Sequence, residues 1–149
     1  MARSSSIGIA LIRAIVGVVF VAHGAQKLLV MGVDGTAGFM ASQHIPLPLV
    51  SAVLVIATEL IGGLALIAGF GTRFIAWPLA FAMLVAVGMV HLGGGFFAPA
   101  GFEYPLTLLV ASIGLGLTGS GAFAVDSVLF NRSTSSPSLA GTPSLGRAA

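Results

Sequence analysis

Residues 13–27 read Arg-Ala-Ile-Val-Gly-Val-Val-Phe-Val-Ala-His-Gly-Ala-Gln-Lys, an apolar run that nevertheless carries four polar side chains. Ionisable groups are costly inside hydrocarbon, so within a membrane helix they pair with one another or serve a function. On a helix, His23, Gln26 and Lys27 share one face because they lie three or four residues apart. We therefore expect this polar stripe to face other helices of the protein rather than lipid.

The composition is typical of a membrane protein. Of the 149 residues, 57% are hydrophobic and only 7% are charged, whereas a soluble domain carries about 25% charged residues. The net charge of +2 comes from scattered side chains, so no basic cluster indicates a nucleic-acid partner. The absence of cysteine excludes disulfides and cysteine-ligated metal centres.

Four apolar runs approach the length of about 20 residues that a membrane-spanning helix needs. We expect these spans at about 7–30, 47–70, 74–92 and 104–124. The first is interpreted as a retained span rather than a signal peptide, because it is too long and lacks an Ala-x-Ala cleavage site. The predicted fold is an all-α membrane protein, a four-transmembrane-helix antiparallel bundle.

Arginines predict the orientation of this bundle. Arg3, Arg73, Arg132 and Arg147 gather on the side of the two termini, which places both termini in the cytoplasm by the positive-inside rule. The chain then divides into a cytoplasmic N-terminus (1–6), a membrane domain (7–130) and a Ser/Pro/Gly-rich cytoplasmic tail (131–149). We expect that tail to be disordered.

Depth along the spans, counted at about 1.5 Å per residue, places the polar side chains at two levels. The outer level supplies the candidate ligand-binding residues, which are His23, Gln26, Lys27, His91, Glu103 and Tyr104. The deeper level holds Arg13 and Glu59, for which we predict a buried ion pair. A proton relay through Glu59 is the alternative, since intramembrane ionisable groups pair or relay protons.

The outer cluster has three interpretations. In the first, Lys27 pairs with Glu103 to pin two helices together, and the histidines satisfy carbonyls or water. In the second, the cluster is a pocket for a quinone or similar ring, where imidazoles exchange protons and Lys27 holds a carbonyl or anionic oxygen. In the third, His23, His91 and Glu103 hold a metal ion or haem, which Lys27 on the same face disfavours.

Several motifs follow one another along the chain. They are Arg13-(x3)-Gly17-(x2)-Phe20-(x2)-His23-Gly24-(x2)-Lys27-Leu28, Ile45-Pro46, Glu59-(x2)-Gly62-Gly63, His91 with Glu103-Tyr104, and Gly119-x-Gly121 with Asp126. In these motifs the chain resembles the DoxX family of small bacterial membrane proteins. The resemblance implies a multi-pass protein of the bacterial inner (plasma) membrane. It also implies a redox association, because the family takes its name from a subunit of a quinone-linked oxidoreductase.

Two functional hypotheses follow. The first is a membrane redox-associated protein, a DoxX-like oxidoreductase component that binds a quinone or small organic ligand in an outer-leaflet polar pocket. Because the chain has no evident electron carrier and no self-sufficient catalytic motif, this hypothesis requires a partner oxidoreductase protein or a bound cofactor. The alternative is a non-enzymatic membrane scaffold or small-solute carrier. The lipid bilayer and further copies of the chain are the other expected partners.

Overall fold

The computed structural model describes residues 3–130, and within that range every regular element is helical, with no strand. The elements in chain order are α1 (Arg3–Ala25), the π-helical turn η1 (Gln26–Met31), α2 (Gly32–Ser42), α3 (Pro48–Ala68), α4 (Thr72–Val85), the π-helical turn η2 (Ala86–His91), the short 3₁₀ turn η3 (Leu92–Gly94), α5 (Glu103–Thr118) and α6 (Val125–Phe130). The predicted all-α class is confirmed. The predicted disordered tail lies outside the described residues.

Three helical stretches are long and apolar enough to cross a membrane: Arg3–Ser42, Pro48–Ala68 and Thr72–Gly94. α5 is apolar but has 16 residues, which corresponds to about 24 Å at 1.5 Å per residue. The fourth run was expected to reach residue 124, but its helix ends at Thr118. Gly119 and Gly121 follow with φ values of 87° and 67°, a left-handed backbone that cannot continue the helix.

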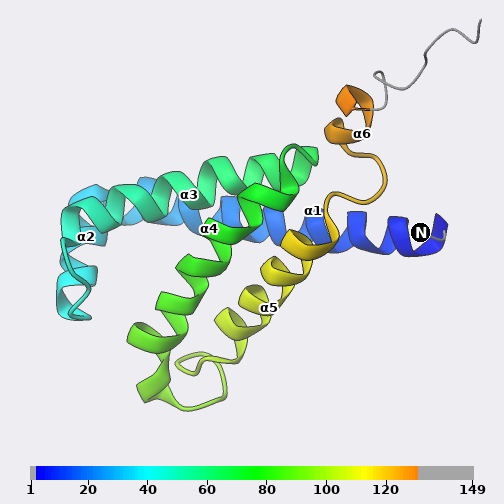
Figure 1. Cartoon of the computed structure of the whole chain (residues 1–149). Helices are drawn as coiled ribbons and strands as arrows, with labels where there is room; N and C mark the ends of the chain where they lie inside the picture. Colours follow the sequence, from blue (N-terminus) through cyan, green and yellow to red (C-terminus); the bar gives the residue numbers. More distant parts are fainter. Residues whose placement is uncertain (1–2, 131–149) are drawn as a thin grey trace, which may run out of the picture.

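The long helices form two antiparallel pairs. α1 lies along α3, and α4 lies along α5, as Figure 1 shows. The turn between α3 and α4 is tight, with Gly69 and Gly71 at φ values of 71° and 59°. Pro48 opens α3 at a position where its missing N–H is not needed. The second and third runs, expected to end near residue 70 and to begin near residue 74, are therefore joined by a short hairpin.

α1 and α3 touch through glycines. A Cβ atom on Gly17 would lie 2.7 Å from the carbonyl oxygen of Gly63, and one on Gly63 would lie 2.8 Å from that of Gly17. A Cβ on Gly24 would lie 3.0 Å from the backbone nitrogen of Leu60. Small residues allow membrane helices to approach this closely, and these contacts fix the register of α1 against α3.

A common core joins the two pairs. It contains Val16 and Phe20 from α1, Leu66 from α3, Ala76, Leu79 and Met83 from α4, and Leu108 and Leu115 from α5. Because all four helices contribute fully buried or nearly buried side chains, they enclose one interior. Most other large apolar side chains of these helices point outward, as expected of a surface that faces lipid.

The first helix does not stop near residue 30. η1 joins it to α2, and a Gly32 φ of 70° marks the start of α2. α2 packs against α3, where Met40, Ile45 and Ala52 form a second small core. The segment between the first two runs is therefore mostly helical.

Candidate functional site

His23 and Tyr104 meet at one end of the bundle. The His23 Nε2 atom lies 3.3 Å from the Tyr104 hydroxyl, and the two ring centroids are 5.8 Å apart. His23 comes from the last turns of α1, and Tyr104 comes from the first turn of α5. At the opposite end, Ala122, just past α5, donates its N–H to the Ser6 carbonyl of α1. α1 and α5 therefore run antiparallel, with the His23–Tyr104 pair joining the C-terminal end of α1 to the N-terminal end of α5.

Lys27 forms an ion pair with Glu59 of α3. Its ammonium lies 2.9 Å and 2.7 Å from the two carboxylate oxygens. The Glu59 side chain is only 2% exposed, whereas that of Lys27 is 23% exposed. The close approach of α1 to α3 at Gly24, where a Cβ would lie 3.1 Å from the Glu59 Cβ, brings the two charges within reach.

This pair corrects two predictions. The predicted Arg13–Glu59 pair is wrong, because Arg13 lies opposite Gly69, and Glu59 stands ten residues earlier on α3. That separation is about 15 Å at 1.5 Å per residue. The alternative Lys27–Glu103 pair is also wrong, because Glu59 takes the ammonium and Glu103 has another partner.

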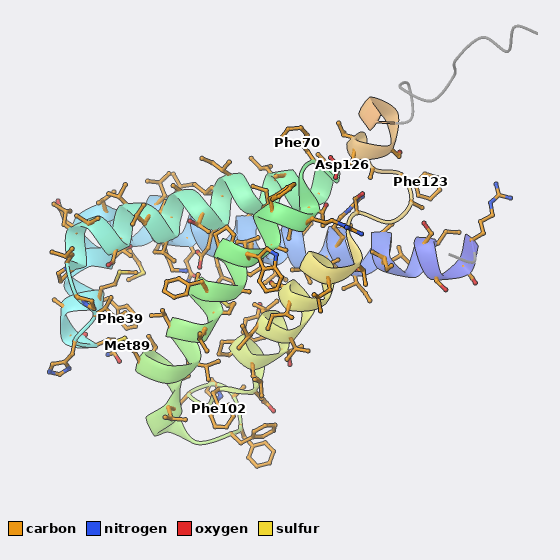
Figure 2. All side chains as sticks on the ribbon, in the orientation of Figure 1. Phe39, Phe70, Met89, Phe102, Phe123 and Asp126 are labelled. Atoms are coloured by element: carbon orange, nitrogen blue, oxygen red, sulfur yellow. The ribbon has the colours of Figure 1, made fainter. Side chains whose placement is uncertain are left out.

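Arg13 instead holds the segment that follows α5. The buried guanidinium donates to the Ser120 carbonyl at 2.7 Å and to the Phe123 carbonyl at 3.4 Å. In the same region, the Asp126 carboxylate accepts the Gly71 N–H at 2.8 Å. Figure 2 shows Asp126 beside the α3–α4 turn and Phe123 turned outward. Arg13 and Asp126 thus hold the segment that follows α5 at the end of the bundle opposite the His23–Tyr104 pair.

His91 and Glu103 organise the loop between η3 and α5. The His91 Nδ1 atom lies 3.1 Å from the Ala100 carbonyl oxygen, and the Glu103 carboxylate accepts the Ala98 N–H at 2.8 Å. Phe102 and Phe96 pack edge to face in this loop, with centroids 5.4 Å apart, and Figure 2 shows Phe102 at this tip. Both polar side chains therefore have structural partners.

The predicted outer cluster is thus divided. His23 contacts Tyr104, and Lys27 pairs with Glu59. His91 and Glu103 contact the backbone of the loop before α5. Gln26 is exposed. Within residues 3–130, no three His, Asp or Glu side chains come close enough to hold a metal ion. The metal set of His23, His91 and Glu103 is therefore wrong.

Two features of this region were not predicted. Lys27 and His91 both lie in six-residue π-helical turns, and such turns often occur at functional sites. The buried Thr36 hydroxyl lies 2.9 Å from the Gly32 carbonyl and 3.2 Å from that of Lys27, which braces η1. Sequence periodicity carries no signal for a π-helical turn, because its composition is that of an ordinary apolar helix.

The arrangement offers a specific chemistry. An imidazole and a phenol can each donate or accept a hydrogen bond, and here they meet beside an apolar interior. Lys27, one turn further along the chain than His23, adds a cation whose charge is balanced by Glu59. This set suits a neutral ligand that carries carbonyl or hydroxyl groups on an apolar ring.

Comparison with known proteins relates the chain to one family. A family model described as DoxX matches residues 8–92. This range includes His23, Lys27 and Glu59 but ends before Tyr104. No solved structure matches the chain significantly.

Three relatives match over most of their length. "Putative oxidoreductase CatD" of Bacillus subtilis (strain 168) is 38% identical over 130 residues, which cover 87% of this chain and 92% of the relative. "Inner membrane protein YphA" of Escherichia coli (strain K12) is 29% identical over 120 residues, covering 76% and 84%. A protein of Haemophilus influenzae, named only as uncharacterized, is 31% identical over 128 residues, covering 83% and 92%.

Proposed function

The chain belongs to the DoxX family of membrane proteins, and on this premise we propose that it binds a quinone or a similar small ring beside His23 and Tyr104, as a redox-associated component of the bacterial plasma membrane. The observation that supports the proposal is the His23–Tyr104 contact of 3.3 Å between α1 and α5. Tyr104 is 44% exposed, so a ligand can reach its side chain. The family relationship and the name of the Bacillus subtilis relative agree with a redox role.

The proposal includes the membrane topology. α5 serves as the fourth span, tilted or set in a locally thinner bilayer because it is short. Arg3 and Arg73 stand at the starts of α1 and α4, which lie at one side of the membrane in this topology. The positive-inside rule then places both termini in the cytoplasm. His23, Lys27 and Tyr104 lie toward the outer leaflet.

The chemistry follows from the donors of the site. A quinone carbonyl accepts a hydrogen bond from Tyr104 or from the imidazole of His23, and reduction to the hydroquinone takes up two electrons and two protons. The imidazole and the phenol can relay those protons. The electrons come from a partner oxidoreductase, because the chain has no cysteine and no residue of its own to carry them.

Binding of a tailless methoxy-substituted benzoquinone to the purified full chain in nanodiscs tests the proposal by calorimetry. Tyr104→Phe removes one hydrogen-bonding hydroxyl, worth about 0.5–1.5 kcal/mol, and should raise Kd roughly two- to tenfold. Thr107→Val is the matched control, because the Thr107 hydroxyl one turn away donates inside α5 to the Glu103 carbonyl. Absence of binding, or equal Kd values for wild type and Tyr104→Phe, would contradict the proposal.

A non-enzymatic scaffold or solute carrier is the second candidate. It is favoured by one observation, namely that Arg13, Glu59, His91 and Glu103 all have structural partners within the fold. The two candidates differ in thermal unfolding with added quinone. A ligand at 100 times its Kd stabilises the native state by about 2.7 kcal/mol, whereas a scaffold without a quinone site shows no shift in Tm.

A further inference from the structure

The two exposed arginines of residues 3–130 both lie at the end of the bundle where α1 and α4 begin. Arg3 opens α1, and Arg73 stands in the first turn of α4. The third arginine at this end, Arg13, is buried and donates hydrogen bonds to the carbonyls of Ser120 and Phe123. Positive charge therefore gathers at this end, and the fold encloses only part of it.

No carboxylate side chain neutralises Arg73. The acidic residues of the whole chain are Asp34, Glu59, Glu103 and Asp126. The first three lie in α2, in the middle of α3 and at the start of α5, away from this end. Asp126 accepts the Gly71 N–H at 2.8 Å and donates its own N–H to the carbonyl of Gly69, the residue against which Arg13 lies. Asp126 thus balances Arg13, and no ion pair within residues 3–130 includes Arg73.

The Arg73 side chain lies along the seam between α4 and α5. A Cβ on Gly119 would lie 3.0 Å from the Arg73 Nε atom and 3.5 Å from its Cγ. One turn further along α4, the Trp77 indole lies over Gly116, where a Cβ would lie 3.1 Å from the ring atom Cε2. Trp77 is 48% exposed, and Arg73 is exposed as well. The two glycines therefore make room for a guanidinium and an indole on one open face of the seam.

Aromatic side chains indicate that this face lies at the membrane surface. Phe70 and Phe74 are exposed beside Arg73, and Figure 2 shows Phe70 turned outward at the α3–α4 turn. Tryptophan is enriched where the headgroups meet the hydrocarbon. Trp77 lies four residues after Arg73, about 6 Å along the helix, and each headgroup region is about 5–8 Å thick. Arg73 can therefore reach lipid phosphates while Trp77 contacts the upper part of the acyl chains.

We propose that the α4–α5 seam at Arg73 binds the phosphate of an anionic phospholipid. A guanidinium binds phosphate through two parallel hydrogen bonds, and basic sites between membrane helices bind anionic headgroups. A zwitterionic lipid carries its own cation next to the phosphate, which opposes the charge of Arg73, so the site prefers a lipid without that cation. This inference does not depend on the ring site at the opposite end of the bundle.

Fluorescence quenching tests the proposal, because Trp77 is the only tryptophan of the chain. The full chain is placed in phosphatidylcholine nanodiscs that contain a small, equal fraction of brominated phosphatidylglycerol or brominated phosphatidylcholine. Bromine near the top of the acyl chain quenches the indole on contact. An arginine near an anionic lipid surface contributes about 1 kcal/mol, so the relative association constant should favour phosphatidylglycerol about fivefold.

Three variants assign the preference to one side chain. Arg73→Gln should quench equally with both lipids, because the exposed guanidinium is removed and the indole stays in place. Arg73→Lys keeps the charge but not the paired donors, so it should retain part of the preference. Arg3→Gln is the matched control and should keep the full preference, because Arg3 is also exposed but lies ten residues before Arg13 on α1, about 15 Å further along the helix.

Each other result overturns the proposal. Equal quenching of the wild type by both lipids shows that the seam does not select anionic headgroups. A preference that survives Arg73→Gln, or that disappears in Arg3→Gln, comes from the general charge of this end and not from Arg73. If inorganic phosphate at constant ionic strength abolishes the preference, the site takes a free anion and the lipid assignment is wrong.

Discussion

The Lys27–Glu59 pair yields an asymmetric prediction about stability. The Glu59 side chain is 2% exposed and that of Lys27 is 23% exposed. Removing Lys27 therefore leaves a buried unpaired charge, whereas removing Glu59 leaves a charge that can reach solvent. Lys27→Met leaves a carboxylate that is almost fully enclosed and has lost both of its contacts to the ammonium. Breaking a buried pair in this way costs about 3–5 kcal/mol.

Glu59→Gln leaves a different residue behind. The Lys27 ammonium sits on a long flexible side chain that is partly exposed, so it can turn toward the headgroup region and regain solvation. Only the loss of hydrogen bonds to a charged group remains, which is worth about 1.5–3 kcal/mol. We therefore expect Lys27→Met to destabilise the protein more than Glu59→Gln.

The double variant Lys27→Met/Glu59→Leu should recover most of the loss, because replacing both charges by apolar groups of similar size is often neutral. The free energy of unfolding is measured by titration with sodium dodecyl sulfate in mixed micelles. Arg3→Met, which removes an exposed charge at the start of α1, is the control and should change little. If the two single losses are equal, or if the double variant is no more stable than Lys27→Met, the argument from exposure is refuted.

Two further predictions concern packing. Gly63→Ala places a Cβ 2.8 Å from the Gly17 carbonyl oxygen, and the required shift of α1 should cost roughly 1–3 kcal/mol, seen as a lower Tm than that of Gly38→Ala. Asp126→Ala removes the acceptor of the Gly71 N–H and should lower the free energy of unfolding by about 1–2 kcal/mol. Proteolysis of the segment after α5 in detergent should then become faster. An unchanged rate would contradict the conclusion that Asp126 holds this segment in place.

The helical class and the apolar spans were predictable because they depend on composition and run length alone. Arg3–Ser42, Pro48–Ala68 and Thr72–Gly94 coincide with runs whose hydropathy excludes a soluble fold. The first run was predicted to end near residue 30, yet its helix continues through η1 into α2. Local composition does not distinguish a helix that bends from one that stops.

The charge partners were not predictable from depth. Counting residues at 1.5 Å each treats every span as upright and assumes where it enters the membrane. In the structure, the register of α1 on α3 is set by the Gly17–Gly63 and Gly24–Leu60 contacts. These contacts place Lys27, not Arg13, beside Glu59. The register of two packed helices depends on contacts between them, whereas counting residues along a span considers that helix alone.

The same register is the reason that we place the proposed ring site at His23 and Tyr104. Lys27 is paired with Glu59, and Arg13 donates hydrogen bonds to backbone carbonyls after α5. His91 and Glu103 contact the backbone of the loop before α5. A polar group already committed to the fold exchanges protons or binds ligand only at the cost of its structural contact. The His23–Tyr104 contact, at 3.3 Å and partly exposed, is the longest and most accessible contact between polar side chains of different helices in the part of the chain that the structure describes. A ligand oxygen can therefore replace it with little loss to the fold, which is the property a binding site requires.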